Sequence, residues 1–566
     1  MKFLIKTSLT SILASLALAA LAEAQGEVYV LPGGTPGAHM GRAVATIGDL
    51  DGDGVPDVLG GSAGSLDSQL RVWSGATGAV LLEVLGTTLT PPAFSWTGVG
   101  PAGDVNGDGV PDFWAANYLH KSSVTGKEWA GAVWIHSGAD GQVLHFFEGT
   151  KGSELVGYHV AGGADLDGDG FADFAIGVPG RQETVVSLGT VFLGGVDVRS
   201  GFDGGILYQI AADSHGSGGG APALLNDLDG DGVPDFVTSG NATAPSGPDT
   251  MLRWFSGADG STLLTLYHPP GVSIGSTIAS AGDVDGDGLF DVVVGSPQEF
   301  CGAGCSGSVR IHSSADASLL MKFQSPSTPP WPRVGTSVDS LGDFDGDGVP
   351  DVAAGTMPPV SIAYVLSGKT GKILFQPTAQ WDSWFGYAVA GAGDLNGDGL
   401  GDLLVGHPLQ VFSSAGAVHV YLAGSPAPVS YCTPKTNSLG CQAKVSWDGL
   451  LSLSIADNFL VRATSIVSSQ LGMLLWSRER AALPFLGGTL CLGAPLVRLE
   501  PKSSGGSPPS ADCSGVLTYA LTQDLAAEQS WSAGDTIHAQ FWYRDPTHPD
   551  QTGAGLSDAV RFQVCP

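Results

Sequence analysis

Basic residues are scarce in this chain of 566 residues, which contains 24 Lys and Arg against 55 Asp and Glu and has a formal net charge of −31 at pH 7. Proteins that bind DNA or RNA present a basic face to the phosphates, so we expect no nucleic-acid partner. Long apolar runs are also missing after the N-terminus, and a membrane-spanning helix needs about 20 mostly apolar residues. We therefore expect no transmembrane segment in the mature protein.

The N-terminus has the pattern of a secretory signal peptide. Two lysines precede a mostly apolar run at residues 9–21, and Ala22 and Ala24 fit a small-residue cleavage site. A membrane anchor is the alternative, but the run is short for a span and polar residues interrupt it. We predict that residues 1–24 form a signal peptide and that the protein is secreted or displayed at the cell surface.

Cysteine is rare, with seven residues that fall into two groups. A close pair lies inside one repeat and the others follow residue 430: Cys301 and Cys305, then Cys432, Cys441, Cys491, Cys513 and Cys565. In an exported protein such cysteines indicate disulfides. Zinc is the alternative for the close pair, but no second close pair completes a four-ligand site. The five C-terminal cysteines leave one unpaired, and their connectivity stays open.

Catalytic motifs are few. No H-E-x-x-H pair occurs among the 12 histidines, and His136 and His312 occupy equivalent strand positions, which favours a packing role. The segment "GGSAG" at residues 60–64 has the form G-x-S-x-G, but a nucleophile at Ser62 would need a strand-turn-helix context. Because the segment follows a strand of a repeat, we predict no catalytic residue here.

What the sequence does contain is an acidic segment of nine residues that occurs seven times. A typical copy reads "DVDGDGLFD", and consecutive copies are 51 to 62 residues apart. The copies begin at Asp49, Asp104, Asp165, Asp227, Asp283, Asp343 and Asp394. A near-constant period of this length indicates a repeat architecture.

Each acidic segment has the composition of a calcium-binding loop. Carboxylates so close together repel one another unless a cation joins them, and positions 1, 3, 5 and 9 can all turn inward in a tightly curled loop. Ca²⁺ accepts six to eight oxygen ligands with flexible geometry, whereas Mg²⁺ demands a stricter octahedron. We predict up to seven structural Ca²⁺ ions. The predicted ligands are Asp49, Asp51, Asp53 and Asp57; Asp104, Asn106, Asp108 and Asp112; Asp165, Asp167, Asp169 and Asp173; Asp227, Asp229, Asp231 and Asp235; Asp283, Asp285, Asp287 and Asp291; Asp343, Asp345, Asp347 and Asp351; and Asp394, Asn396, Asp398 and Asp402.

An EF-hand is the main alternative for these loops. An EF-hand needs a bidentate Glu at position 12 of the loop, whereas none of the seven copies is acidic at that position and the flanking residues are strand-like. We reject the EF-hand. A second alternative, that some loops bind no metal, applies most to the two copies with Asn106 and Asn396.

Each repeat contains four short strand-like segments. Tight turns with Gly next to Asp, Thr or Ala join the third and fourth segments, as in "LRVWSGATGAVLLEVL". Seven units of four strands predict a seven-bladed β-propeller, an all-β fold whose closed ring leaves only short sheet edges. The strand-like "GEVYVLPGG" at residues 26–34 has no acidic loop of its own, and we expect it to complete the blade that holds the last loop.

The repeats resemble a known family at this point. The acidic loops, with "GVP" at 177–179, "GSP" at 295–297 and "GHP" at 406–408, are similar to FG-GAP repeats. FG-GAP repeats form the calcium-binding propeller of integrin α chains and of many secreted bacterial proteins. The resemblance covers about residues 25–425, although only Phe385 and Gly386 form a true "FG". It implies a propeller domain over this region.

The tail at residues 430–566 lacks acidic loops and holds most of the cysteines. Its strand-like segments predict a small β-sandwich with disulfides. Its start, "YCTPKTNSLGC", and its end resemble, more loosely, a C-terminal module of exported bacterial proteins. That resemblance implies a role in attachment to the cell surface.

For function, we favour a non-catalytic propeller that binds a glycan or a protein. The loops opposite the acidic ones carry aromatic side chains, which are common platforms for sugars and partner proteins: Trp96, Trp331, Trp381 and Trp384, with Tyr118, His120 and Trp129 expected on the same face. Filling of gaps between blades is the alternative for these residues. A polysaccharide lyase or hydrolase and a purely structural envelope component are the other hypotheses. A cluster of Lys, Arg, His or Tyr in the central funnel would favour an enzyme, and the sequence shows no such cluster.

Overall fold

The structure of the protein is a computed structural model. It describes residues 27–34, 37–63, 68–89, 95–185, 189–192, 194–211, 216–244, 247–268, 275–300, 306–325, 332–358, 360–379, 383–409, 415–424, 428–448, 451, 453, 459–506, 512–532 and 535–564. The predicted signal peptide lies outside the described residues, as do Cys301, Cys305, Trp331, Trp381 and Cys565. The chain forms two compact units, of which the larger comprises Val30–Leu395 and Gly399–Ala423 and the smaller contains Gly424–Pro566.

The larger unit consists of seven four-stranded antiparallel sheets, which we number as blades in chain order. Blades 1 to 3 consist of β2 (Met40–Ile47), β3 (Asp57–Ser62), β4 (Gln69–Trp73) and β5 (Val80–Leu85); β6 (Gly98–Gly103), β7 (Asp112–Asn117), β8 (Ala132–His136) and β9 (Val143–Glu148); and β10 (Val160–Ala164), β11 (Asp173–Gly177), β14 (Gly195–Arg199) and β15 (Ile206–Ala211). Blades 4 and 5 consist of β16 (Gly216–Leu224), β17 (Phe236–Ala244), β18 (Gly247–Phe255) and β19 (Thr262–Tyr267); and β20 (Thr277–Gly282), β21 (Asp291–Phe300), β22 (Ser306–His312) and β23 (Leu319–Gln324). Blades 6 and 7 consist of β24 (Val338–Gly342), β25 (Asp351–Gly355), β26 (Ala363–Leu366) and β27 (Ile373–Phe375); and β28 (Val389–Gly393), β29 (Asp402–His407), β30 (Ala417–Tyr421) and β1 (Glu27–Pro32). The prediction of a seven-bladed propeller with four-stranded blades is confirmed.

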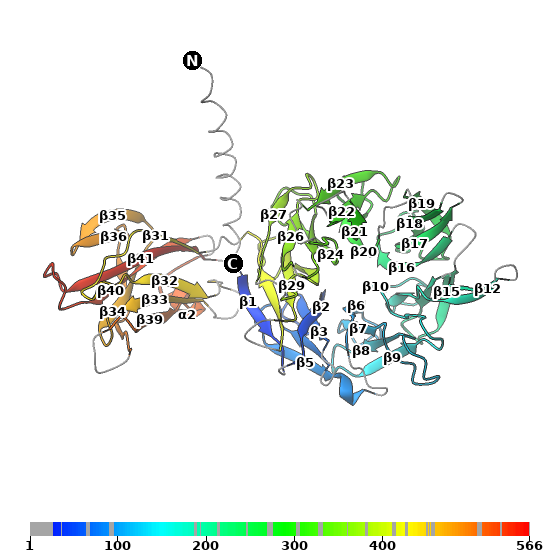
Figure 1. The fold of residues 1–566 in the computed structure, drawn as a ribbon, viewed down its shortest axis with the longest axis horizontal. Coiled ribbons are helices and arrows are strands. Elements are labelled where there is room, and N and C mark those ends of the chain that lie inside the picture. Colours follow the sequence, from blue (N-terminus) through cyan, green and yellow to red (C-terminus); the bar gives the residue numbers. More distant parts are fainter. Residues whose placement is uncertain are drawn as a thin grey trace, which may run out of the picture. The chain divides into compact units, whose positions relative to one another are not determined.

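The first strand of each repeat is the innermost strand of its blade, and these strands close a ring. β2 contacts β6, and the contacts continue through β10, β16, β20, β24 and β28 back to β2. Figure 1 shows β2, β6, β10, β16, β20 and β24 around the centre of the ring. Hydrogen bonds cross between blades near the seam: Thr46 Oγ1 donates to the carbonyl of Gly391 at 2.6 Å, and the amide of Gly391 donates to Asp339 Oδ2 at 3.0 Å.

The N-terminal strand completes the last blade, as the sequence predicted. β1 lies beside β30 in the sheet of β28 and β29, so blade 7 contains both the first and the last strand of the propeller. Just after β1, the amide of Gly33 donates to the carbonyl of Gly416 at 2.9 Å. A three-stranded blade would expose an unpaired edge strand, and this arrangement supplies its partner.

Apolar clusters between neighbouring blades form the core. Leu59, Phe113 and Trp134 are essentially inaccessible to solvent and belong to one cluster that joins blades 1 and 2. The second strands of five blades, β3, β7, β11, β25 and β29, are buried along their whole length, because the adjacent blades cover both of their faces. Continuous apolar runs in the second strands therefore follow from their position in the ring.

Blade 3 departs from the expected strand order. In the sequence, the segment "GTVFLGGVDV" at residues 189–198 has the pattern of a single third strand for this repeat. Instead, β12 (Gln182–Val185) pairs with β13 (Gly189–Phe192) in a separate two-stranded hairpin, and the third strand of the blade is β14 alone. A hairpin inserted between two blade strands has the same alternating pattern and turn residues as a blade hairpin, so the sequence could not distinguish them.

The smaller unit is a β-sandwich, as predicted. One sheet has the order β31 (Val429–Tyr431), β41 (Ala554–Gln563), β40 (Thr536–Arg544), β34 (Leu471–Ser477) and β37 (Val497–Arg498), with β38 (Lys502–Ser503) also paired to β34; the other has the order β32 (Lys444–Asp448), β33 (Leu460–Ile466) and β39 (Gly515–Ala520). Apolar side chains from both sheets share one core that includes Val461, Leu517 and Phe541. A hairpin of β35 (Arg480–Phe485) and β36 (Gly488–Leu492) and a short helix, α2 (Gln523–Glu528), complete the unit.

Two disulfides lie within the sandwich unit. Cys432 pairs with Cys491 and Cys441 pairs with Cys513, which settles the connectivity of four of the five C-terminal cysteines. The paired cysteines are 59 and 72 residues apart in the chain. Within the described ranges, no helix is long and apolar enough to cross a membrane.

Candidate functional site

The acidic loops all occupy the same place in their blades. Each connects the innermost strand to the second strand, as the loop between β20 and β21 does in blade 5. Because the innermost strands of all seven blades run from the same face of the ring to the other, all seven loops lie on one face of the propeller. The starts of the innermost strands lie on the opposite face.

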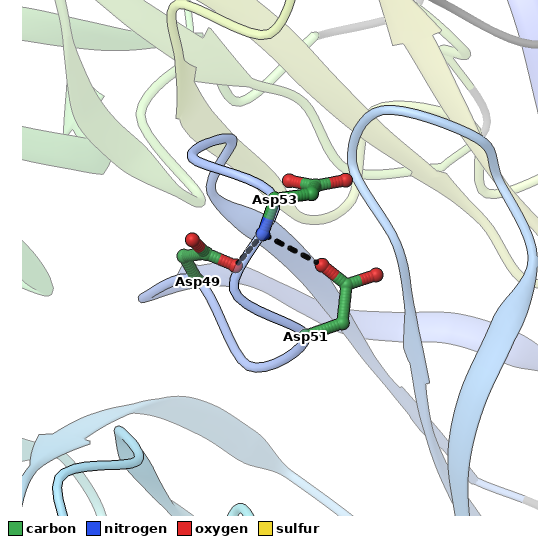
Figure 2. A group of neighbouring side chains, drawn as sticks. All are labelled: Asp49, Asp51 and Asp53. Carbon is green, nitrogen blue, oxygen red and sulfur yellow. Dashed lines mark hydrogen bonds between the residues drawn. The ribbon is translucent and has the colours of Figure 1, made fainter.

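The side chains of each loop hold its backbone in a tight curl. In blade 1, Asp49 Oδ1 accepts hydrogen bonds from the amides of Gly52 at 2.7 Å and Asp53 at 3.1 Å, and Asp49 Oδ2 accepts one from Gly54 at 2.7 Å. Asp51 Oδ1 also accepts from the amide of Asp53, at 3.2 Å (Figure 2). The curl requires a left-handed backbone at Gly52 and Gly54, whose φ angles are 78° and 88°.

Five of the loops bring three carboxylates close enough to share one cation. In each group, one oxygen from every residue lies within 4.8 Å of the others. The groups are Asp49, Asp51 and Asp53; Asp165, Asp167 and Asp173; Asp227, Asp229 and Asp235; Asp283, Asp285 and Asp291; and Asp343, Asp345 and Asp347. Clustered carboxylate oxygens in a flexible loop are the donor set that Ca²⁺ prefers, so the residues present fit a hard divalent cation.

The aspartate at position 9 has a structural role that the sequence analysis missed. Asp57 is inaccessible to solvent, its Oδ2 accepts from the amide of Leu50 at 2.7 Å, and its Oδ1 accepts from the amide of Gly75 at 3.0 Å. Burial raises the pKa of Asp57 to about 6, although both hydrogen bonds lower it. The same paired bonds recur in every blade, so this carboxylate ties the acidic loop to the turn after the third strand. Its equivalents are Asp112, Asp173, Asp235, Asp291, Asp351 and Asp402.

The two loops with asparagine replace one carboxylate by an amide that bonds within the loop. Asn106 Oδ1 accepts from the amide of Asp108 at 2.9 Å, and its Nδ2 donates to Asp108 Oδ2 at 2.9 Å. Asn396 makes the equivalent bonds to Asp398 at 3.0 and 3.1 Å. The amide relieves part of the repulsion that the other five loops contain.

The remaining motif residues have packing roles. Ser62 is buried at the end of β3, and its hydroxyl accepts from the amide of Gln69 at 2.6 Å, which is not the setting of a nucleophile elbow. His136 and His312 are buried, and the Nδ1 of each lies within hydrogen-bonding distance of a carbonyl in the following turn, at 3.0 and 3.2 Å. The packing role predicted for this histidine pair is confirmed.

The aromatic residues divide into core and surface groups. Trp96 is inaccessible and packs edge-on against Trp134 at 5.3 Å between ring centroids, and His120 is buried against the same ring. Gap filling is therefore the role of Trp96 and His120. Trp129 is exposed, and Tyr118 and Trp384 are half-buried.

Three blades and a loop bring together a group of side chains that the sequence did not reveal. The group, which we call the channel-mouth cluster, comprises Arg42, Tyr118, Tyr158, Trp384 and Tyr387. The Arg42 guanidinium lies 3.9 Å from the centroid of the Tyr387 ring and 5.4 Å from that of Trp384, and the rings of Tyr118 and Tyr158 are 5.0 Å apart. No cluster of Arg and Tyr is visible in the sequence itself, because the other members of the group lie 76 to 345 residues from Arg42 in the chain.

Comparison with known proteins agrees with the repeat pattern. The FG-GAP repeat family matches residues 156–193, 275–312 and 385–421, which begin in blades 3, 5 and 7. Integrin alpha-4 of Xenopus laevis is 24% identical over 270 residues, which are 44% of this chain and 24% of that protein. Integrin alpha-5 of Xenopus laevis is 29% identical over 225 residues, 35% of this chain and 20% of that protein, and integrin alpha pat-2 of Caenorhabditis elegans is 32% identical over 164 residues, 25% and 13%. The chain thus spans about a quarter or less of the length of these relatives. It forms a β-propeller that contains three segments matching the FG-GAP repeat family and that is similar to part of the integrin α chains.

Proposed function

We propose that this protein is an extracellular, calcium-binding β-propeller that binds a glycan or protein ligand without chemical conversion. The observation that carries the proposal is that the two faces of the ring carry different kinds of residues. One face repeats the same carboxylate loop in every blade, which serves the scaffold. The opposite face gathers the channel-mouth cluster, whose members differ from blade to blade, as a specific binding surface requires. The resemblance to integrin α chains supports a role in adhesion.

Calcium has a structural role in this proposal. The aspartates and asparagines at positions 1, 3, 5 and 9 of the seven loops would hold the ion, with occupancy weakest in the loops of Asn106 and Asn396. The bound ion neutralises carboxylates that otherwise repel one another across a few ångströms. The position-9 carboxylate links each loop to the turn after the third strand, so an ordered loop also fixes that turn. Binding to the folded state alone adds to its stability.

An extracellular enzyme that cleaves polysaccharides is the second candidate, and the channel-mouth cluster is the observation that favours it. An elimination at a sugar acid needs a cation to neutralise the carboxylate and a base to take a proton. A tyrosine serves as base only if its pKa falls, and burial raises the pKa of both Tyr158 and Tyr387. Protonated phenols donate hydrogen bonds, so the cluster is better suited to binding than to proton abstraction.

The location of the protein forms part of the proposal. A signal peptide at residues 1–24 would direct the chain out of the cytoplasm, and the sandwich unit would attach it to the cell surface. Disulfides such as Cys441–Cys513 are typical of proteins that fold in an oxidising compartment, which supports export.

A retention assay tests the proposed function. The purified protein is incubated with a panel of polysaccharides and extracellular-matrix proteins, in calcium and in EDTA, and both retention and new polysaccharide chain ends are measured. We expect calcium-dependent retention without new ends. New chain ends would show that the protein is an enzyme, and the absence of any retention would leave a structural envelope role.

A further inference from the structure

The residue seven positions before each acidic loop lies within two residues of the start of the innermost strand in six blades and inside β16 in blade 4, towards the face opposite the loops. In blades 1, 3 and 7 this residue is large: Arg42, Tyr158 and Tyr387. In blades 2, 4, 5 and 6 it is small: Thr97, Gly220, Ser276 and Thr336. This face of the ring is therefore asymmetric, with cationic and aromatic side chains in blades 1, 3 and 7 and small residues at the same position in the other blades.

Blade 2 also contributes to the large side of the mouth. Its own residue at this position is Thr97, whose hydroxyl accepts a hydrogen bond from the amide of Tyr118 at 3.3 Å. This bond holds Tyr118, which follows β7, against Tyr158 of blade 3. The charges of Tyr118 and Tyr387 both raise the pKa of Tyr158, after the larger effect of burial, so the three phenols are electrostatic neighbours. Four consecutive blades, 7, 1, 2 and 3, thus build one surface.

Among the described residues, the polar groups of this surface have no hydrogen-bonding partners. The Nη1 of Arg42 is buried and has no hydrogen bond, and no carboxylate forms an ion pair with Arg42 within the described part of the chain. The hydroxyls of Tyr118, Tyr158 and Tyr387 likewise make no hydrogen bond to any described residue. A guanidinium that is partly removed from water costs free energy unless an anion or an acceptor compensates it. The aromatic contacts of Arg42 with Tyr387 and Trp384 compensate only in part.

We propose that the channel-mouth cluster binds the carboxylate of a uronic-acid residue in an acidic glycan. Arginine matches a carboxylate with two parallel hydrogen bonds, which makes it the residue suited to this group. The phenol hydroxyls supply donors and acceptors for sugar hydroxyls, and the ring of Tyr158, 39% exposed, offers a flat apolar face for a pyranose ring. A glycan is favoured over an acidic peptide because one isolated cation among several aromatic rings suits a single charge on a polyhydroxylated ring. This inference rests on the proposed ligand-binding function and names its ligand class.

The test measures binding of the full chain in calcium to tetragalacturonate and to a hyaluronan hexasaccharide by isothermal titration calorimetry. Each probe is paired with its methyl ester, which keeps the sugar rings and removes the charge. We expect at least one acid to bind. The affinity of its ester should be lower by roughly tenfold or more, because a hydrogen bond to a charged group is lost. This comparison needs no variant, so it holds whether or not a substitution disturbs folding.

Variants then assign the site. Arg42→Gln should weaken binding of the acid roughly tenfold or more, Arg42→Lys should weaken it less, and Tyr158→Phe should weaken it while the fold stays intact. Arg333→Gln is the matched control, because Arg333 is an exposed arginine three residues before Thr336, the blade 6 residue that corresponds to Arg42. Its affinity should equal that of the unmodified protein. Circular dichroism and the melting temperature verify the fold of each variant.

The outcomes separate the inference from the proposed function. Equal binding of acid and ester, unchanged binding by folded Arg42→Gln, or no binding of either acid at millimolar concentration would overturn the inference. If the protein still retains neutral glycans or proteins in the panel, the proposed function stands without it. An acidic peptide that binds through Arg42 when neither sugar acid does would also overturn the assignment to a uronic acid. If no ligand binds in either assay, both the inference and the proposed function are contradicted.

Discussion

The guanidinium of Arg42 lies 3.9 Å from the centroid of the Tyr387 ring, although 345 residues separate the two in the chain. Arg42 belongs to blade 1 and Tyr387 to blade 7, so this cation–π contact crosses the seam at which the ring closes. Such a contact contributes about 0.5 to 2 kcal/mol, depending on desolvation. The seam is tied a second time by β1, which pairs with β30.

Removal of β1 should destabilise the propeller more than its six residues would suggest. A chain that starts at Gly34 would leave blade 7 with three strands and expose the edge of β30, whereas a chain that starts at Gly26 retains the pairing. We expect the shorter chain to melt at a lower temperature and to associate through its open edge. Thermal unfolding and size-exclusion chromatography of the two chains measure both effects, and identical behaviour would show that β1 does not close the ring.

Chelation of calcium should lower the melting temperature of the larger unit. A site contributes about 2.7 kcal/mol when free calcium exceeds its Kd a hundredfold, and five or more sites act together. We therefore expect a decrease on the order of 10 °C or more in EDTA, with recovery when calcium is restored. Calorimetry with metal analysis of the same samples measures this. An unchanged melt after confirmed metal loss would contradict a structural role for calcium.

Two aspartates of the blade 5 loop should respond differently to substitution by asparagine. Asp285 is exposed, and Asn106 and Asn396 occupy its position in two other loops, so Asp285→Asn should weaken calcium binding with little change in stability in EDTA. Asp291 is buried and accepts from the amides of Val284 and Ser314, so Asp291→Asn should cost about 2 to 4 kcal/mol even in EDTA.

Urea unfolding of both variants, with and without calcium, measures this difference. An Asp291→Asn variant as stable in EDTA as the unmodified protein would show that its two hydrogen bonds carry little weight. Equal losses for both variants only in calcium would assign both residues a purely ligating role.

His136 should make the stability of the propeller depend on pH. Burial lowers the pKa of His136 to about 4, from 6.5 for the exposed side chain. Above pH 6.5 the histidine is neutral in both states and has no effect; as the pH falls from 6.5 to 4, the unfolded chain gains a proton that the folded chain does not, and stability decreases by about 3 kcal/mol.

The variant His136→Phe isolates this effect, because Phe255 occupies the equivalent strand position in blade 4. The difference in unfolding free energy between variant and unmodified protein, measured in EDTA at pH 7 and pH 4.5, removes the contribution of the metal loops. We expect the pH dependence to be weaker in the variant. Parallel curves would mean that His136 becomes protonated in the folded state.

The sequence by itself determined the number of blades, their strands and the place of the acidic loops. These properties are local: each repeat carries its own turn residues, its alternating strands and its acidic segment, and each acidic loop bonds mostly within nine residues. The partnership of the N-terminal strand with the last blade also followed from the sequence, because residues 26–34 have a strand pattern without a loop. The inserted hairpin β12–β13 was not predicted, because its local sequence pattern is the same as that of a blade hairpin.

Only the tertiary structure decided the second role of the position-9 aspartates and the membership of the channel-mouth cluster. The carboxylate of Asp57, at the start of β3, accepts a hydrogen bond from the amide of Gly75, which follows β4. The pairing of β3 with β4, rather than the loop motif, sets that contact. Arg42, Tyr118, Tyr158 and Tyr387 meet because ring closure brings blades 7, 1, 2 and 3 side by side at one mouth. A closed ring converts distant positions in the chain into neighbours, and no local pattern in the sequence records which side chains then face one another.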